Sequence, residues 1–317
     1  MKLKEIYRLA IEQGIKHDPR GQEKVMELLR KTNEEFRDLK EEEKADFDLE
    51  RMENPYSDTR ILCGNENLEV KRLLAGIDIE VGELLLAERL GGFDLVLAHH
   101  PEGKALAALD NVMHLQEDLL EKYGVPINVA ESILSARITE VKRSLLPINH
   151  DKAVDTARLL KLAFMCVHTP ADNLASSFLD NLFAEKKPQT VGDVVKILKK
   201  VPEYVHAQQL NAGPEVINGT KERRCGKIFV DMTGGTSGSE EAYEKLSQAG
   251  VGTVVGMHMS EKHRKKAEKA HINVVIAGHI ASDSLGMNLF LDQLEERGIQ
   301  IETCSGLYRV KRNSAKA

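Results

Sequence analysis

Residues 94–103 read DLVLAHHPEG, and this stretch guides the interpretation of the whole chain. Its first half, DLVLA, is a short apolar run typical of a buried strand, and two histidines and a proline follow it. The runs AFMCV (163–167), GTVVG (252–256) and NVVIA (273–277) are followed in the same way by His168, His258 and His279. Because ligands gather at the carboxyl ends of strands in open parallel sheets, these imidazoles are predicted to converge on one site.

Short apolar runs alternate with helical patterns along most of the chain. Further strand patterns lie at 72–79, 227–231 and 299–303, and helical patterns at 81–90, 111–123, 129–161, 191–200, 239–249, 261–270 and 284–297. This alternation predicts an α/β fold in which helices cover parallel sheets. We expect a helical extension (1–54), an N-terminal α/β lobe (55–184), a connecting segment (185–226), a C-terminal α/β lobe (227–310) that 299–303 completes, and a solvated basic tail (311–317).

Composition excludes several classes of protein. With 317 residues, 42% apolar and 30% charged, the chain is expected to be a soluble globular protein of two domains. A net charge of -6, 4% aromatic residues and no Trp argue against a nucleic-acid partner. No apolar run approaches the ~20 residues that span a membrane, and the N-terminus lacks the apolar core of a signal peptide. The four cysteines are widely separated, which favours reduced thiols and a cytoplasmic location.

A carboxylate follows two of the strand-end histidines at the same spacing. The candidate metal ligands are therefore His99, His100, Asp172, His279 and Asp283. Mixed imidazole and carboxylate ligands suit Zn, Mn, Fe, Co or Ni, and this set, with one aspartate bridging, leaves positions open for water on two divalent metal ions. Two alternatives stay open: the aspartates are helix N-caps, or the histidines are hydrogen-bonded structural residues.

Two further groups are candidates for a role in chemistry. Residues 233–238 (TGGTSG) follow a strand and precede a helix, so their backbone N–H groups would form an anion nest at a helix N-terminus. The candidate phosphate-binding residues are Gly234, Gly235, Thr236, Ser237 and Gly238, and an ordinary glycine-rich turn is the alternative. His168 and His258 are candidates for proton transfer.

With these residues in place, the chain resembles the NIF-three-like family (NGG-interacting factor three), some members of which are labelled GTP cyclohydrolase I type 2. LAHHPEG (97–103) is similar to the family's HHP motif, HTPAD (168–172) to its HTxxD motif, and AGHIASDSLG (277–286) to its GHxxSE motif. The resemblance covers roughly residues 57–310. It implies two related α/β lobes that face each other, a dinuclear metal site between them, and assembly into a homo-oligomer, commonly a ring-shaped hexamer.

The resemblance also assigns roles to single residues. His99 and His100 match the paired histidines and would bind different metals, while Asp172 and His279 match further ligands. Asp283 occupies the position of a bridging glutamate, one methylene shorter. His168 belongs to the HTxxD motif, and we expect it to contact a metal ligand rather than the metal itself.

The expected function is a dinuclear-metal hydrolase that uses metal-activated water on a phosphorylated or nucleotide-like small molecule. Ring opening of GTP would be one such reaction. The alternatives are a non-catalytic metal-binding or metal-delivery protein and a ring-shaped regulatory scaffold.

Overall fold

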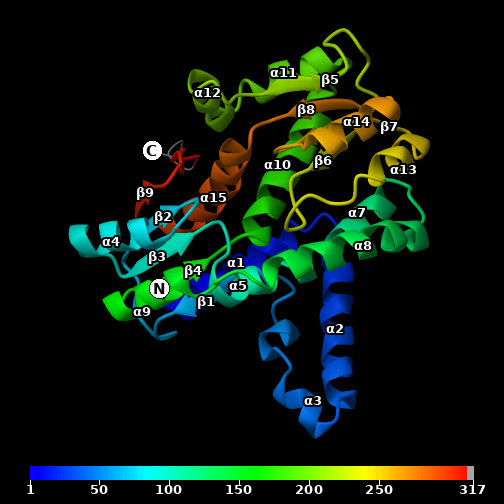
Figure 1. Ribbon diagram of the computed structural model, residues 1–317. Coiled ribbons are helices and arrows are strands. Elements are labelled where there is room, and N and C mark those ends of the chain that lie inside the picture. Colours follow the sequence, from blue (N-terminus) through cyan, green and yellow to red (C-terminus); the bar gives the residue numbers. More distant parts are fainter. Residues whose placement is uncertain (313–317) are drawn as a thin grey trace.

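Two open sheets form the framework of the computed structural model, which describes residues 1–312 (Figure 1). The first sheet has the strand order β1-β4-β3-β2-β9 and the second has the order β5-β8-β7-β6. The strands are β1 (Arg60–Cys63), β2 (Arg72–Gly76), β3 (Leu95–Ala98), β4 (Ala163–Cys166), β5 (Glu215–Asn218), β6 (Lys227–Asp231), β7 (Val251–Gly256), β8 (Asn273–Ile276) and β9 (Gln300–Cys304). The central strands are apolar on both faces, as expected for parallel strands covered by helices.

The two lobes repeat one topology. In each, an antiparallel edge strand pairs with the last of three parallel strands, as β1 does with β4 and β5 with β8. Both edge pairs carry a register shift, between Ile61 and Cys63 in the first lobe and between Val216 and Asn218 in the second. The prediction of an α/β fold with two related lobes is confirmed.

Helices cover both faces of each sheet. On the first sheet, α4, α5 and α9 cover one face, and α1, α10 and α15 cover the other. On the second, α6–α8, α13 and α14 cover one face, and α10–α12 and α15 cover the other. The bounds are α1 (Leu3–Lys16), α2 (Gln22–Asp38), α3 (Glu41–Ala45), η1 (Leu49–Met52), α4 (Val81–Leu90), α5 (Gly103–Ala107), α6 (Leu109–Val112), α7 (Leu115–Lys122), α8 (Ile127–Leu145), α9 (Lys152–Leu160), α10 (Thr169–Lys186), α11 (Val191–Leu198), α12 (Pro202–Gln209), α13 (Ala242–Gln248), α14 (Glu261–Lys269) and α15 (His279–Glu295).

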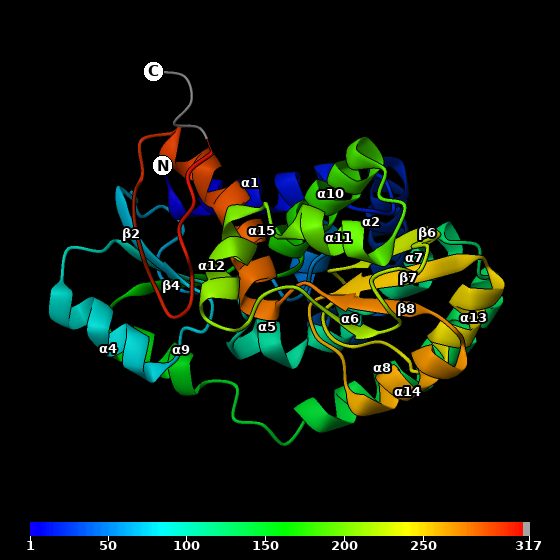
Figure 2. The same cartoon turned by 90° about the horizontal axis from the view of Figure 1, so that it is seen from above.

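Helices α10 and α15 cross between the lobes (Figure 2). Helix α10 packs Leu174 into the core of the first lobe and Leu179 into that of the second. Helix α15 runs in the opposite sense, with Leu285 in the second core and Phe290 in the first. At the crossing, a Cβ atom on Gly286 would lie 2.2 Å from the carbonyl oxygen of Ala171, so only glycine fits this approach. The crossing brings the first turns of the two helices together.

The last strand returns to the first lobe. Strand β9 pairs in parallel with β2, from Arg72 opposite Gln300 to Gly76 opposite Cys304. The prediction that residues 299–303 complete the C-terminal lobe is therefore wrong. The physical reason is the path of α15, which carries the chain across to the first sheet before β9 begins.

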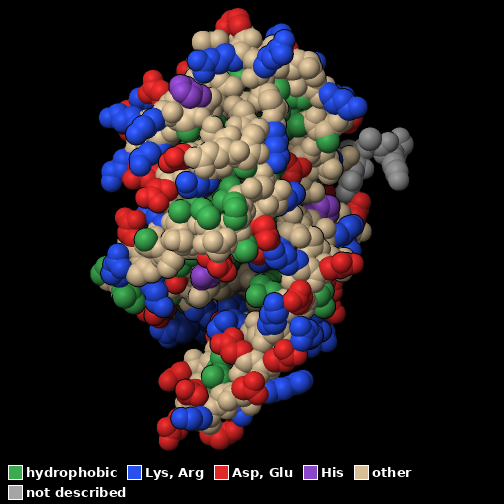
Figure 3. All heavy atoms as spheres, turned by 90° about the vertical axis from the view of Figure 1, so that its right-hand side faces the viewer, with side chains coloured by type: hydrophobic (Ala, Val, Ile, Leu, Met, Phe, Trp, Pro, Cys, Tyr) green, Lys and Arg blue, Asp and Glu red, His purple; other side chains and the backbone are tan. Residues whose placement is uncertain are grey.

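The N-terminal helices differ from one another. Helix α1 buries Leu3, Ile6 and Ala10 in the core of the first lobe. Helices α2 and α3 project away from both lobes as an arm (Figure 1). Charged side chains of both signs cover the projecting arm (Figure 3). The segment 1–54 thus contains one core helix besides the projecting arm.

The C-terminal basic residues that the structure describes are tied to the body. Arg312 donates to both carboxylate oxygens of Glu203 at 2.7 Å, and Glu203 is 1% exposed. Arg309 likewise donates to Asp292 and Glu295. The expectation of a solvated tail is wrong for Arg312, because buried acidic partners neutralise it. Residues 313–317 of the expected tail lie outside the described residues.

Within residues 1–312, none of the helices has both the length and the apolar character needed to cross a bilayer.

Candidate metal centre

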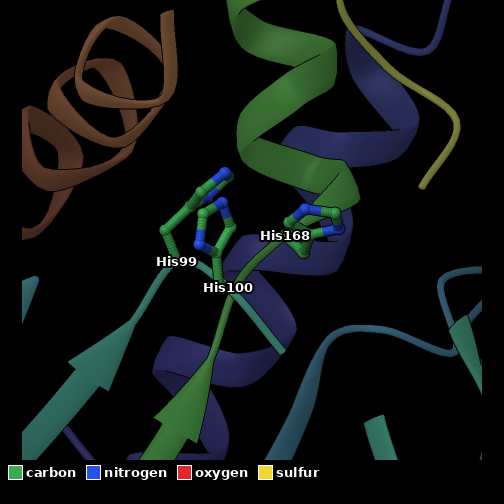
Figure 4. Close-up of side chains that lie close together, drawn as sticks. All are labelled: His99, His100 and His168. Carbon is green, nitrogen blue, oxygen red and sulfur yellow. The ribbon is translucent and has the colours of Figure 1, made fainter. Parts of the chain in front are cut away.

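The strand-end histidines do converge. His99 and His100 follow β3, and His168 follows β4 and occupies the N-cap of α10. Figure 4 shows these three rings gathered just beyond the strand ends, beside the first turn of α10. His279 and Asp283 reach the same place from α15, and Asp172 reaches it from α10.

Each of three imidazoles is held through its Nδ1 atom. His99 donates from Nδ1 to the carbonyl oxygen of Val167 at 3.0 Å. Nδ1 of His100 lies 2.6 Å from Oδ1 of Asp78, and Nδ1 of His168 lies 2.8 Å from Oδ2 of Asp58. Because the oxygen partners accept, the proton belongs on Nδ1, and the Nε2 lone pair of each ring is left free to bind a cation.

Asp283 faces both groups of histidines. Its Oδ1 atom lies 3.6 Å from Nε2 of His99, and its Oδ2 atom lies 3.6 Å from Nε2 of both His100 and His279. Asp172 adds Oδ1 at 3.5 Å from Nε2 of His99. Two ligand atoms of one tetrahedral cation are about 3.4 Å apart when each lies about 2.1 Å from it, so these separations suit shared coordination better than hydrogen bonding.

The central donor atoms have no partner. His99 Nε2, Asp172 Oδ1 and both carboxylate oxygens of Asp283 are buried without a hydrogen bond among the residues described. Burying such atoms unsatisfied is costly, and a divalent cation would satisfy all of them. The donor set, imidazole nitrogen with carboxylate oxygen, therefore fits a Zn, Mn, Fe, Co or Ni ion.

The electrostatics distinguish the two carboxyl groups. Burial is the largest influence on the pKa of Asp283, but His99, His100 and His279 outweigh it and hold that pKa below its usual range. Burial, followed by the charge of Asp283, raises the pKa of Asp172 well above its usual value. The histidines therefore favour the ionised form of Asp283, whereas burial and the charge of Asp283 favour the protonated form of Asp172.

The histidines also differ. Burial lowers the pKa of His99 to about 4, which keeps this ring neutral. Burial lowers the pKa of His100 as well, but Asp283 and Asp78 outweigh it and raise that pKa to about 9. Burial lowers the pKa of His279. Without a cation, His100 is the ring that carries the compensating charge.

The two structural alternatives left open by the sequence do not account for the cluster. The N-cap residues of α10 and α15 are His168 and Gly278, so neither Asp172 nor Asp283 is an N-cap. The two His–Asp pairs have the same spacing in the sequence but not the same place in their helices. Asp283 lies one residue further into α15 than Asp172 does into α10. A purely structural role for the histidines would explain their Nδ1 bonds but not the unpartnered Nε2 atom of His99.

The cluster opens into a cavity. Its wall includes residues of the cluster and of the glycine-rich loop, together with His258: His168, Asp172, His279, Asp283, Gly235, Thr236, Ser237, Gly238 and His258. Residues of both lobes therefore line one cavity.

The glycine-rich loop lies at this cavity but not at a helix N-terminus. Helix α13 begins at Ala242 with Glu241 as its N-cap, so the prediction of a nest directly at a helix start is wrong. Gln116 donates to the carbonyl oxygens of Gly234 and Thr236, and Arg137 donates to that of Ser237. Among the described residues, the amides of Gly234, Gly235, Ser237 and Gly238 have no hydrogen-bonding partner.

His258 follows β7 just as His100 follows β3, two residues after the end of the strand. Ala98 and Gly256 end their strands in the same way, each accepting a hydrogen bond from the residue after the neighbouring strand, Val167 or Ala277. The ring centroid of His258 is 4.9 Å from that of His279, and burial lowers its pKa. His258 therefore faces the cluster as a neutral imidazole.

Sequence reasoning missed the two carboxylates that hold the histidines. Asp78 follows strand β2, so the rule that polar groups gather at strand ends would have found it. Asp58 precedes β1, and because β1 runs antiparallel its start lies at the same edge as the carboxyl end of β4. Nothing local marks Asp58, since its position depends on that pairing.

Comparison with solved structures shows proteins to which this chain is similar. The chain is similar to the crystal structure of a NIF3 superfamily protein from Sphaerobacter thermophilus, with 30% identity, a TM-score of 0.73, and coverage of 81% of this chain and 94% of that one. It shares a fold with reduced HcgD from Methanocaldococcus jannaschii, at 17% identity and a TM-score of 0.52, over 77% of this chain and 87% of that one. No family model and no curated protein matches the chain.

Proposed function

The chain belongs to the NIF3 superfamily, and we propose that it is a hydrolase that holds two divalent cations between its lobes. The observation that carries this proposal is the arrangement around Asp283. Its two carboxylate oxygens are buried and unpartnered, and each faces a different set of histidines. A single carboxylate placed in this way is suited to bridge two cations.

The donor atoms divide into two groups. His99, Asp172 and Oδ1 of Asp283 would hold one cation, and His100, His279 and Oδ2 of Asp283 would hold the other. Divalent cations in such a site lower the pKa of a bound water and polarise an electrophile. His168 is fixed by Asp58, and its Nε2 atom lies 3.8 Å from Oδ2 of Asp172, beyond hydrogen-bond distance. His258, neutral and at the cavity wall, would accept and return a proton.

The glycine-rich loop supports a phosphorylated or nucleotide-like substrate. Side chains behind the loop bind its carbonyl groups, while several of its amides are left without a partner among the described residues. Unpaired amides beside a cation site are suited to bind a phosphate. GTP belongs among the candidate substrates for this reason only.

Metal content per chain tests the proposal first. Elemental mass spectrometry should find about two divalent ions in the wild type, and fewer in both His99→Ala and His279→Ala. His114→Ala is the matched control, because this histidine is exposed and pairs with Glu117, away from the cluster. Circular dichroism should show that all variants fold.

Turnover tests the second half of the proposal. A panel of phosphoesters and nucleotides, GTP included, should reveal hydrolysis that His258→Ala abolishes without loss of metal. Failure to bind Zn, Mn, Fe, Co or Ni after reconstitution would refute the hydrolase and favour a scaffold. Bound, exchangeable metal without turnover would favour a metal-delivery protein.

The proposal extends to assembly and location. We expect a homo-oligomer, which light scattering during size-exclusion chromatography would detect. The four cysteines are free thiols, which supports a cytoplasmic location.

A further inference from the structure

A buried hydrogen-bond network joins the glycine-rich loop to the N-terminal extension. Thr233, the first residue of the loop, donates from its hydroxyl to Oδ1 of Asn173 at 2.7 Å. Asn173 follows the candidate ligand Asp172 on α10 and is fully buried. Across the part of the chain that the structure describes, the other side-chain hydrogen bonds of the loop come from α7, α8 and α14. The bond from Thr233 therefore ties the loop to the helix that carries Asp172.

The orientation of the Asn173 side chain follows from its other partners. Its Nδ2 atom lies 3.2 Å from the carbonyl oxygen of Gly14 and 3.3 Å from Oδ2 of Asp18. Because a carbonyl oxygen and a carboxylate accept hydrogen bonds, the amide nitrogen faces them and the amide oxygen faces Thr233. The hydroxyl of Thr233 is thus held as a donor.

Asp18 is itself held in place. Arg20 donates to its two carboxylate oxygens at 2.9 and 2.8 Å, and the hydroxyl of Tyr56 donates to Oδ2 at 2.8 Å. Burial raises the pKa of Tyr56 well above its usual value, so the phenol keeps the proton that it donates. Gly14 permits this close packing, since an added Cβ would lie 2.7 Å from the ring of Tyr56. The network thus runs from the end of α1 through Asn173 to the loop.

We propose that Asn173 is a positioning residue, which holds the glycine-rich loop in place against the metal cluster, and that the N-terminal segment 14–20 holds Asn173 in turn. A phosphate bound by the loop amides would reach the cations only if the loop keeps its place, and small misplacements of such groups are costly. The inference deepens the proposed function and rests on it for the phosphate. The hydrogen bonds alone carry the placement of the loop.

Two substitutions at Thr233 test the bond to Asn173. Thr233→Val keeps the shape of the side chain but removes the hydroxyl, which leaves Oδ1 of Asn173 without its donor. Thr233→Ser keeps the hydroxyl and should behave as the wild type does. Thr156→Val is the matched control, because the hydroxyl of Thr156 bonds within α9 of the other lobe.

The measurement is ¹⁵N relaxation of the full-length protein labelled with ¹⁵N-glycine. Gly234, Gly235 and Gly238 report on the loop, and Gly82 on α4 is the internal reference. In Thr233→Val, the order parameters of the loop glycines should fall from about 0.85 towards about 0.6, while that of Gly82 stays unchanged. Metal content should equal that of the wild type, since no ligand is altered. Inorganic phosphate should bind roughly fivefold or more weakly, because a mobile loop is less often in its binding conformation.

A substitution in the network tests the path from the N-terminal extension. Tyr56→Phe removes the hydroxyl that donates to Asp18, and Tyr56 lies outside both the loop and the cluster. It should loosen the same loop glycines, to a smaller extent than Thr233→Val does. The double variant should match Thr233→Val alone, because both changes act through Asn173 and their effects are not additive.

Equal loop order in Thr233→Val and the wild type would overturn the inference, as would a loss of order that Thr233→Ser shares or a loss of metal from Thr233→Val. Additive effects of the two substitutions would overturn the path through Asn173. If Thr233→Val does not fold, Tyr56→Phe decides the matter. A loop that loosens as expected in a protein without metal, phosphate binding or turnover refutes only the proposed hydrolase. A working hydrolase whose loop ignores Thr233→Val refutes only this inference.

Discussion

Asp78 illustrates how residues behind the ligands control a metal centre. Its carboxylate holds Nδ1 of His100 at 2.6 Å and contributes to the raised pKa of that ring. Asp58 does the same for the orientation of His168, and Thr169 donates a second hydrogen bond to it. At the scale of single residues, the ligands and the groups that orient them form one unit.

Replacing Asp78 with Asn should therefore weaken metal binding without touching a ligand. The amide cannot stabilise the ring as the carboxylate does, and losses of about 10–100-fold in affinity are typical of such changes. Competition for Zn with a chromogenic chelator measures the effect. Glu88→Gln, an exposed change on the nearby helix α4, is the control. Equal affinities in Asp78→Asn and the wild type would contradict the role given to Asp78.

Metal affinity should rise with pH up to about 9, the pKa of His100 in the metal-free chain. Below that pH the ring is protonated and must lose its proton to bind a cation, so affinity climbs by up to roughly tenfold per pH unit. His99 does not contribute near neutrality, since its pKa is about 4.

Calorimetry in two buffers of different ionisation enthalpy measures this proton release directly. Titrations between about pH 6 and 8 cover the range in which His100 is protonated. Metal binding that releases no protons in this range would rule out His100 as a ligand.

At the scale of elements, the site depends on the close crossing of α10 and α15. Gly286 touches Ala171 there, and these residues neighbour the ligands Asp283 and Asp172 along their helices. The backbone contact fixes the distance between the two helices. It thereby fixes the separation of the two carboxylates that come from different lobes.

Gly286→Ala should push the helices apart, because its Cβ would lie 2.2 Å from a backbone oxygen that cannot move independently. We expect the free energy of unfolding to fall by about 1–3 kcal/mol and metal content to fall with it. Chemical denaturation and elemental analysis measure the two effects. Gly82→Ala on α4 is the matched control, since nothing lies within 4 Å of its added Cβ. A fully loaded, equally stable Gly286→Ala protein would contradict this account.

The elements also show what the sequence can and cannot predict. Apolar runs predict the buried parallel strands well, because burial on both faces leaves a local signal. The edge strands β1 and β5 were missed, since residues such as Arg60 and Glu215 interrupt any such run. The histidines at strand ends were found by the same local rule. Asp58 was not, because only the tertiary pairing of β1 with β4 brings it to the site.

At the scale of the whole molecule, the lobes are interleaved along the chain. Helices α10 and α15 each pack into both cores, and β9 returns to the first sheet after the second is complete. A local pattern predicted a strand at β9 but could not identify its partner β2. Neither sheet has its covering layers unless the other lobe is folded as well.

The protein should therefore unfold in one cooperative transition rather than lobe by lobe. Calorimetric and van't Hoff enthalpies should agree. Because the chain has no Trp, a single Trp reports one lobe at a time: Phe93→Trp in the first and Tyr243→Trp in the second. In each variant, the fluorescence midpoint should equal the midpoint of the global transition, which far-UV circular dichroism of the same variant measures. Separate transitions would contradict the interleaved arrangement.

The return of β9 also affects how the protein is made. During synthesis, β2 leaves the ribosome long before β9, the strand that covers its free edge. An uncovered edge strand is a template for pairing with other chains. The last two ligands, His279 and Asp283, also arrive late. Between the synthesis of β2 and that of α15 and β9, a nascent chain thus has an uncovered edge on its first sheet and an incomplete metal cluster. Chaperones would be needed most during this period.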